Sequence, residues 1–442
     1  MVSISDIATA LESILTENAS ALARPSGFVR RESKLTGPLF TKTLVLGWLA
    51  NPDASLSELC QVVAELGVSI TPQGLEERFG PRAVAYLEQL LTRAVEKFIA
   101  AEPTAIPILA RFGQVIIEDS TTIGLPDALS EYWQGTGERT GHNQSALKLQ
   151  VRFDLCTGRL RGPLLQAGRA HDKTSPLQTS LPPVGSLHLA DLGYFSLDRL
   201  ADEDAANVYW LRRLPVLTAV FDSEGRRWEL RRLLDVQHTA QGTVDLEVSI
   251  GNEKRLGCRL LGVRVPQAVA DQRRRKLHAE ARHKGQPVSQ ARLKLADWTI
   301  LVTNCPPELL SIEEALVLAR VRWQIELLFK LWKSQGGLDR SRSKQPLRIL
   351  SEVYAKLLGL LIQHWFLLLS CWSRPERSLI KAASTVRHNV ALLIAALSGY
   401  LDLHLAIGHI QSTIALGCRM NPRRKAPNAY QLLLNLPEVA YA

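Results

Sequence analysis

The chain has 442 residues, of which 46% are apolar and 22% are charged. This is the composition of a folded, soluble protein, and it excludes an intrinsically disordered chain. The length exceeds what one ordinary hydrophobic core supports, so we expect two to four domains. The formal net charge of +10 favours an anionic partner, and nucleic acid is the commonest partner of that kind.

The cysteines and the apolar runs exclude further classes of protein. The six cysteines are scattered and form no C-x-x-C pair, so we expect neither a zinc ribbon nor a disulfide framework, and a reducing cytosol fits. No basic region precedes an apolar core at the start, so we expect no signal peptide. The most apolar run, residues 357–372, is interrupted by Gln363 and His364 and is too short to span a bilayer. We therefore expect a cytoplasmic protein without a membrane partner, with a buried helix in this run.

Residues 1–105 predict a helical DNA-binding domain. Ser55 and Glu58 match the S-x-x-E capping box at the start of a helix. Gly67 then breaks that helix, and Thr71-Pro72 starts another, with threonine as the cap and proline at the first position. Two short helices around a glycine turn resemble a helix-turn-helix. A small helical bundle that does not touch DNA explains the same pattern, and both alternatives stay open.

Residues 106–214 predict the first part of a catalytic core built on strands. The expected elements, in chain order, are a buried strand over 115–117 that ends at Glu118-Asp119, a half-buried strand over 147–155, a turn at Thr157-Gly158, a partner strand over 160–166, a buried strand over 187–190 that runs into Asp191, a helix over about 196–205 and a strand over 208–211. Two of these strands lead directly into an aspartate.

Residues 215–296 predict a β-rich insertion that ends in a basic segment. Short strands are expected over 216–221, 227–233, 244–250 and 258–265. The basic runs Arg273–Lys276 and Arg282–Lys284 should lie on a helix. Their charges are either a solvated helix face or contacts to phosphates, and the neighbouring features favour phosphates.

Residues 297–350 predict the second part of the core, and residues 351–442 predict a helical C-terminal region. A buried strand is expected over 298–302, and a helix should start near Ile312. At about 100° per residue, one narrow stripe of this helix holds four charged side chains, Arg322, Glu326, Lys330 and Lys333. Apolar side chains flank the stripe on both sides, namely Val321, Ile325, Leu328 and Trp332 on one and Trp323, Leu327 and Leu331 on the other. Because the helix is apolar almost all round, we expect its charges to line a cleft inside the protein.

Three carboxylates in these elements are candidates for metal binding. Asp119 and Asp191 each end a short apolar strand, and side chains at neighbouring strand ends converge on one edge of a sheet. Two acids brought together there repel each other unless a cation lies between them. Glu326, from a covering helix, would complete an oxygen site suited to two Mg²⁺ ions. Such a pair of ions activates a water or a 3′-hydroxyl and stabilises the leaving oxygen at phosphorus.

Each of these acids also has a plain structural explanation. An aspartate at a strand end is a common turn former or helix cap, and Glu326 with Lys330 is an ordinary i,i+4 ion pair. The histidines offer no better metal site, because they are far apart and lack the H-x-x-x-H spacing. No P-loop and no serine or cysteine triad stands out. The functional interpretation depends on the three acids occurring together with a cationic stripe.

The sequence resembles a known family at these residues. Asp119-Ser120-Thr121-Thr122, the later Leu189-Ala190-Asp191 and the spacing Arg322-x-x-x-Glu326-x-x-x-x-x-x-Lys333 are similar to the DDE transposases of bacterial insertion sequences, of the IS4 type. That group carries a Y-x-x-R-x-x-x-E-x-x-x-x-x-x-K signature on a helix, and three of its four positions are matched. The resemblance covers residues 110 to about 340 and implies an RNase H-like α/β core with the β-rich insertion between the second and third acids.

The resemblance implies a role for several residues. The metal-binding catalytic acids would be Asp119, Asp191 and Glu326. The cofactor would be Mg²⁺, for which Mn²⁺ can substitute. The side chains that would grip DNA phosphates near the cleaved end are Arg322 and Lys333, with Lys330 as a helper.

Two further positions bear on the implied mechanism. Ala319 stands where the signature has a tyrosine, so one phosphate contact is missing and catalytic efficiency is in doubt. Trp298 stands where hairpin-forming relatives stack a tryptophan on a base extruded from the duplex. The alternative for Trp298 is a core aromatic that opens a strand.

The function implied by the resemblance is that of a DNA transposase. It would bind the terminal inverted repeats of its own element, cut the double-stranded DNA, and join the ends to target DNA, through hairpin ends and as a homodimer in a synaptic complex. It would work on the bacterial nucleoid. Two alternatives stay open: a DNA-binding relative whose acids no longer assemble, and a metal-dependent nuclease that cuts but cannot join.

Overall fold

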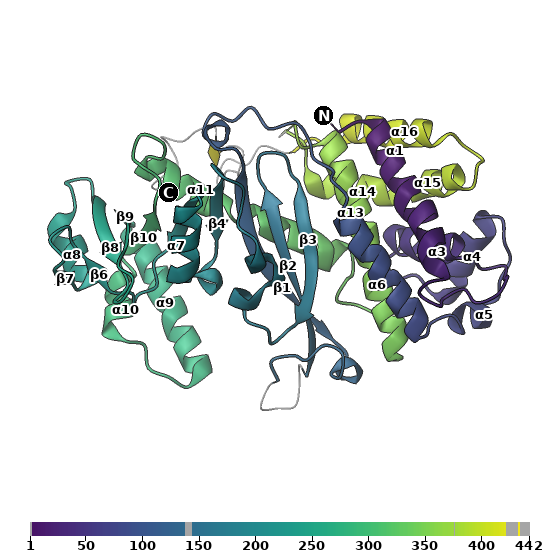
Figure 1. Cartoon of the computed structure of the whole chain (residues 1–442), viewed down its shortest axis with the longest axis horizontal. Coiled ribbons are helices and arrows are strands. Elements are labelled where there is room, and N and C mark those ends of the chain that lie inside the picture. Colours follow the sequence, from purple (N-terminus) through teal and green to yellow (C-terminus); the bar gives the residue numbers. More distant parts are fainter. Residues whose placement is uncertain (1, 138–143, 375, 421–431, 434–442) are drawn as a thin grey trace. The chain divides into compact units, whose positions relative to one another are not determined.

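The structure is a computed structural model that describes residues 2–137, 144–374, 376–420 and 432–433. The chain forms two compact units of mixed α/β architecture, and each unit is assembled from separate segments (Figure 1). The first unit comprises Met1–Thr104, Ser120–Ala170 and Ile325–Pro422, and the second comprises Ala105–Asp119, His171–Gln324 and Arg423–Ala442. The N-terminal helices thus belong to one unit with the C-terminal helices. Of the expected C-terminal region, residues 421–431 and 434–442 lie outside the described residues.

The first unit is mostly helical. Its helices are α1 (Ile4–Glu12), η1 (Ser13–Asn18), α2 (Ala19–Ala23), α3 (Gly37–Ala50), α4 (Leu56–Glu65), α5 (Pro72–Glu76), α6 (Pro81–Val95), η3 (Asp127–Leu129), α12 (Gln324–Lys330, whose first residue closes the second unit), η7 (Leu331–Gln335), α13 (Pro346–Ser370), α14 (Leu379–His388), α15 (Val390–Leu397) and α16 (Leu403–Gly417). The predicted capping box is present, because Ser55 Oγ accepts from the Glu58 backbone N–H and the Glu58 carboxylate accepts from the Ser55 N–H. Thr71 caps α5 as predicted, and Gly67 before it has φ +87°. Both short helices are confirmed, and their contact with DNA stays a prediction.

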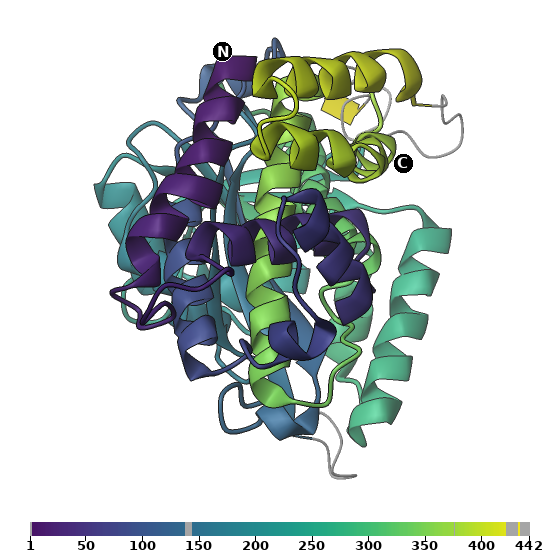
Figure 2. The same ribbon diagram turned by 90° about the vertical axis from the view of Figure 1, so that its right-hand side faces the viewer.

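Helix α13 is the core of the first unit. It packs against α3, α6 and α14, and the N-terminal helices surround it in Figure 2. It is long and apolar enough to cross a membrane, but 94% of its most apolar window is buried inside the protein. The expectation of a buried helix in this run is therefore confirmed. Helix propensity alone does not hold so apolar a segment in place, and its burial against three neighbours does.

A β-hairpin completes the first unit. Strands β2 (Ser145–Asp154) and β3 (Leu160–Ala167) pair antiparallel, as predicted, and the strand order is β3-β2-β1. The prediction of a half-buried β2 is wrong, because Gln150 and Asp154 on its polar side are also buried. Both are hydrogen-bonded, as buried polar groups must be: the Gln150 amide donates to Gln166 Oε1 at 3.1 Å, and Asp154 accepts from the Thr157 hydroxyl at 2.6 Å.

The hairpin turn requires a glycine. Gly158 has φ +70°, a conformation that L side chains rarely adopt, and a Cβ there would collide with Leu368 of α13 and the ring of Trp372. We expect Gly158→Ala to lower the free energy of unfolding by about 2–4 kcal/mol, measured by chemical denaturation, since it combines backbone strain with overpacking. Gly285→Ala is the matched control, because Gly285 also has positive φ but open space around its Cβ. Equal losses in the two variants would contradict the packing argument.

The second unit is built on a mixed sheet with strand order β1-β4-β5-β10-β9-β8-β6-β7. The strands are β1 (Val115–Leu125, which continues into the first unit), β4 (Leu187–Ala190), β5 (Tyr209–Arg213), β6 (Val220–Phe221), β7 (Arg227–Trp228), β8 (Thr243–Ile250), β9 (Leu256–Arg264) and β10 (Trp298–Thr303). The helices are η2 (Leu109–Arg111), η4 (Asp172–Thr174), η5 (Pro176–Thr179), η6 (Leu192–Tyr194), α7 (Leu197–Ala205), α8 (Leu230–Gln237), α9 (Gln267–Lys284), α10 (Gln290–Leu295) and α11 (Ile312–Val321). Strand β4 runs parallel to β1 and β5, whereas β10 is antiparallel to β5 and β9.

Two expectations about these strands are wrong. Strand β1 does not end at Asp119 but continues to Leu125, because the β-branched residues that follow the aspartate favour an extended chain. The expected strand over 227–233 is mostly helix α8, in which three leucines at helical spacing (Leu230, Leu233 and Leu234) are buried. The other predicted strands are present, although β6 is only two residues long. The basic segment is confirmed as a helix, α9; the side chain of Lys284 lies outside the description.

Candidate active site

Strands β1 and β4 bring two aspartates together. They are parallel, and the last pair in their register is Glu118 with Ala190. The next residue along each strand is an aspartate, Asp119 on β1 and Asp191 just beyond β4. The apolar residues before each aspartate are buried, which fixes this register. Asp119 therefore lies within its strand and Asp191 at a strand end, and the two are adjacent across the sheet.

One arginine contacts both aspartates. Arg322 donates from Nη1 to Asp119 Oδ2 at 2.7 Å, and its Nη2 lies 3.4 Å from Asp191 Oδ1. The arginine and Asp119 are largely buried, whereas the Asp191 side chain is 46% exposed. A guanidinium between two carboxylates offsets the repulsion that would otherwise push them apart. The arrangement keeps two negatively charged oxygen groups side by side at a place that solvent can reach.

The donor chemistry of this pair fits a divalent cation. Carboxylate oxygens are the ligands that Mg²⁺ prefers, and Mg²⁺ commonly takes only one or two carboxylates from the protein. Among the described residues, no three His, Cys, Asp or Glu side chains gather into a set that could hold a metal ion. Asp119 and Asp191 are thus a pair of carboxylates whose chemistry suits such an ion.

The helix that carries the charged stripe is interrupted. Helix α11 ends at Val321 and α12 begins at Gln324, so the expected continuous helix is wrong. At the break the Trp323 N–H bonds to the Arg320 carbonyl, three residues back, which tightens the turn and shifts the stripe. One predicted apolar flank is buried as expected, namely Val321, Ile325, Leu328 and Trp332. On the other flank Trp323 and Leu327 are exposed, at 59% and 41%, so the helix is not buried all round.

The remaining residues of the stripe belong to the first unit. Glu326 is half-buried on α12, Lys330 is exposed at the end of α12, and Lys333 is half-buried on η7. Lys333 Nζ donates to the carbonyl of Thr122 on β1 at 2.7 Å. Burial lowers the pKa of Lys333, against the opposing charge of Asp339. Lys333 on η7 thus contacts β1 at Thr122, and Asp119 is on the same strand, three residues earlier in the sequence.

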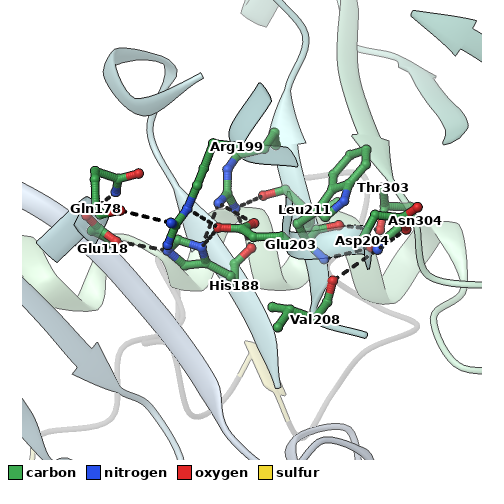
Figure 3. Close-up of polar contacts among 12 residues, drawn as sticks. Glu118, Gln178, His188, Arg199, Glu203, Asp204, Val208, Leu211, Thr303 and Asn304 are labelled. Carbon is green, nitrogen blue, oxygen red and sulfur yellow. Dashed lines mark hydrogen bonds and ion pairs between the residues drawn. The ribbon is translucent and has the colours of Figure 1, made fainter. Parts of the chain in front are cut away.

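A buried charge network lies beneath the aspartates, and sequence reasoning missed it. His188 on β4 lies between two carboxylates, with Nδ1 2.7 Å from Glu203 Oε1 and Nε2 3.2 Å from Glu118 Oε2 (Figure 3). Arg199 and Arg212 also approach Glu203, at 3.1 and 3.4 Å. Because alternate side chains on a strand point to opposite faces, Glu118 faces this network while Asp119 faces the other side. The network thus ties together the strands that carry the two aspartates.

The electrostatics of the network centre on Glu203. Burial alone would raise the pKa of its carboxyl, but the charges of His188 and Arg212, together with the His188 hydrogen bond and Arg199, hold that pKa at about 2. The signals in the sequence were a polar residue in each of two apolar strands, Glu118 and His188. Such residues are buried only when they are paired, but the sequence does not show which partners they have.

Trp298 is part of the hydrophobic core of the second unit. Only 6% of it is exposed, at the start of β10, among residues of β8, β9 and α8. Its ring meets His238 edge to face at 5.9 Å between centroids. Stacking on an extruded base requires an open ring face, which Trp298 does not present here. The buried position is that of a core aromatic that opens a strand, and stacking on an extruded base stays a prediction.

Comparison with known proteins matches this region, and most of the chain, to transposases. The family model described as "Transposase DDE domain" matches residues 110–362, which include Asp119, Asp191 and Glu326. The chain is 30% identical over 85% of its length to the transposase for insertion sequence element IS231C of Bacillus thuringiensis subsp. berliner, of which 83% is covered. It is 29% identical over 79% of its length to the IS231F transposase of Bacillus thuringiensis subsp. israelensis (77% covered), and 23% identical over 79% to the IS1151 transposase of Clostridium perfringens (78% covered).

Proposed function

Because this chain belongs to the IS4-type DDE transposases and is a DNA transposase, we propose that it cuts and joins DNA at a metal site formed by Asp119, Asp191 and Glu326. Its proposed substrates are the terminal inverted repeats of its own element and a target DNA. The observation that carries the proposal is the contact of Asp119 and Asp191 with the same guanidinium, Arg322. The positive charge of Arg322 stabilises the two carboxylates next to each other.

The proposed cofactor is Mg²⁺, with Mn²⁺ as a substitute, because both prefer oxygen ligands. Asp119 and Asp191 would hold the metal, with Glu326 as the third acid. A bound divalent ion supplies the positive charge that activates the attacking oxygen and stabilises the leaving oxygen at phosphorus. The register of β1 and β4 would hold two of the proposed ligands side by side before any metal binds.

The cationic side chains around the acids would position the DNA strand. Arg322 pairs with both aspartates in this structure, and its guanidinium would exchange these contacts for a phosphate oxygen when a metal neutralises the acids. Lys333 donates to the Thr122 carbonyl. Lys330 is exposed one turn earlier and would add a weaker contact. The mixed α/β architecture supports the RNase H-like core implied by the family, with the β-rich insertion as part of the same sheet.

Each step of the reaction would exchange one P–O bond for another, so no added energy source is required. In cutting, a water oxygen bonds to phosphorus while the bond from phosphorus to the 3′ oxygen breaks, which leaves a 3′-hydroxyl and a 5′-phosphate. That 3′-hydroxyl would then bond to a phosphorus of the opposite strand while the bond from this phosphorus to the 3′ oxygen of the flanking DNA breaks, which gives a hairpin, a step implied by the family alone. A second water would open the hairpin, which restores the 3′-hydroxyl and leaves a 5′-phosphate on the opposite strand. In joining, the 3′-hydroxyl would bond to a target phosphorus while the bond from that phosphorus to its 3′ oxygen breaks.

Recognition of the element ends is proposed for the N-terminal helices. Helices α4 and α5 form a compact pair around Gly67, and Arg24, Arg30 and Arg31 precede them in the sequence. A homodimer would hold both ends of the element in the synaptic complex. The positive net charge of +10 supports work on nucleoid DNA in the cytoplasm.

The test is a cleavage and joining assay with the full chain. A labelled duplex that carries the end of the element is incubated with Mg²⁺, with Mn²⁺ or with a chelator, in the presence of a target plasmid. We expect nicked ends and joined products with either metal and none with the chelator. Binding without cleavage in either metal would favour the non-catalytic DNA-binding relative. Cleavage without joined products would favour the nuclease.

A further inference from the structure

A cavity in the second unit adjoins the C-terminal end of α11, the helix that leads into Arg322. It has a volume of about 480 Å³ and is formed by the ends of β5, β9 and β10 together with α9 and α11. This volume is in the range of about 300–1,000 Å³ that is usual for ligand sites. Neither the metal chemistry nor the N-terminal helices account for it.

The charges on the cavity wall all have one sign. Its lining includes four arginines, Arg213, Arg264, Arg273 and Arg320, and among the described residues that line it none is Asp or Glu. Arg213, Arg264 and Arg320 are exposed, so three guanidinium groups reach solvent around one hollow. A concave surface that presents several guanidinium groups and no carboxylate among its described lining residues attracts an anion.

The fourth arginine is held in place by neutral groups. Arg273 donates to the Trp298 carbonyl and to Thr299 Oγ1, both at 2.9 Å, and more weakly to the Ala296 carbonyl. Burial and then the charge of Arg213 lower the pKa of Arg273. The next arginine on α9 is different, because Arg274 pairs with Asp271 and Asp297. Arg273 is thus positioned by the protein while its charge stays available to a ligand.

The cavity and the acids share one short segment of the chain. Ala319 and Arg320 at the end of α11 line the cavity, and Arg322, two residues on, contacts Asp119 and Asp191. The cavity and the paired aspartates therefore both adjoin the C-terminal end of α11. Ala319 contributes only a methyl group to the cavity wall, so a larger side chain at this position is expected to occupy part of the hollow.

We propose that this arginine-lined cavity binds the sugar–phosphate backbone of the DNA next to the cleavage site. The inference rests on the proposed function, since it takes the bound polyanion to be the DNA substrate. Contacts to phosphates do not depend on the base sequence. The cavity should therefore contribute equally to the affinity for element ends and for other DNA. Arg213, Arg264 and Arg320 would each donate to a phosphate oxygen. Arg273 would donate to the phosphate group that lies deepest in the cavity.

The test measures how DNA binding by the full chain depends on salt. Fluorescence anisotropy with an end duplex and with an unrelated duplex of equal length, both in a chelator, gives the slope of log K against log salt. Each lost phosphate contact should make this slope shallower by about 1. We expect this for Arg213→Ala, Arg264→Ala and Arg320→Ala on both duplexes. Arg232→Ala, an exposed arginine on α8 outside the cavity, is the matched control.

A second variant tests the cavity without changing any charge. Ala319→Leu should fill the hollow and make the slope shallower while all four arginines remain. The proposal is overturned if the three arginine variants and Ala319→Leu match the Arg232→Ala slope. A protein that cuts and joins DNA but shows this result would disprove the cavity site alone. A protein that binds neither duplex would disprove the proposed function as well.

Discussion

Asp119→Ala is expected to abolish cleavage and joining while DNA binding persists. The substitution removes one of the two carboxylates that meet at Arg322, and with it a ligand of the proposed metal. Residues that only support a ligand typically cost 10–100-fold when they are changed, so loss of a ligand should exceed about a hundredfold. The measurement is the initial rate of end cleavage in Mg²⁺ and in Mn²⁺. Binding should be equal or slightly tighter, because a negative charge is removed near the DNA.

Controls for this prediction separate metal binding from folding. Asp119→Asn keeps the shape of the side chain and its acceptance from Arg322 but loses the charge, so it should be nearly as inactive as alanine. Asp198→Asn on α7 removes an exposed carboxylate that pairs with Lys254 at the surface, and it should cleave normally. If Asp119→Asn retains activity close to that of the unmodified chain, Asp119 does not bind the metal.

The sequence predicts local features of this fold well, because they depend on neighbouring residues. The capping box at Ser55 and the glycine turn at Gly158 are both present. The prediction that Asp119 and Asp191 come together from neighbouring strands also agrees with the register. Each of these follows from short-range patterns or from the general topology of parallel strands.

The failures concern long-range contacts. Strand β1 appeared to end at Glu118-Asp119 because polar residues usually mark a strand end, yet Glu118 is fully buried beside His188 of another strand. Arg322 contacts both acids from the break between α11 and α12, and no turn-forming residue in the sequence predicts that break. Glu118 and His188 are far apart in the sequence, and so are Arg322 and the two aspartates. The third acid, Glu326, stays a prediction that rests on the signature spacing.

Glu203→Gln is expected to lower the free energy of unfolding by about 3–5 kcal/mol at pH 7, since it breaks a buried charge network and leaves Arg212 and His188 without their shared carboxylate. Chemical denaturation followed by tryptophan fluorescence measures the loss. Asp198→Asn on the same helix is the matched control, and its exposed ion pair should be worth less than about 1 kcal/mol. Similar losses in the two variants would show that the network contributes no more than a surface pair.

The pH dependence gives this prediction its second readout. The pKa of Glu203 is about 2 in the folded protein, lowered from an ordinary value of 4.5. A group whose pKa is lower in the folded state binds fewer protons there, so its stabilisation is present above about pH 4.5 and is lost as the pH falls toward about 2. The unmodified chain should therefore lose stability more steeply than Glu203→Gln across this window, and the two curves should converge at its acid end. Parallel curves would mean that Glu203 titrates normally. In that case the ion pairs of Glu203 with His188 on β4 and Arg212 on β5 would not stabilise these strands.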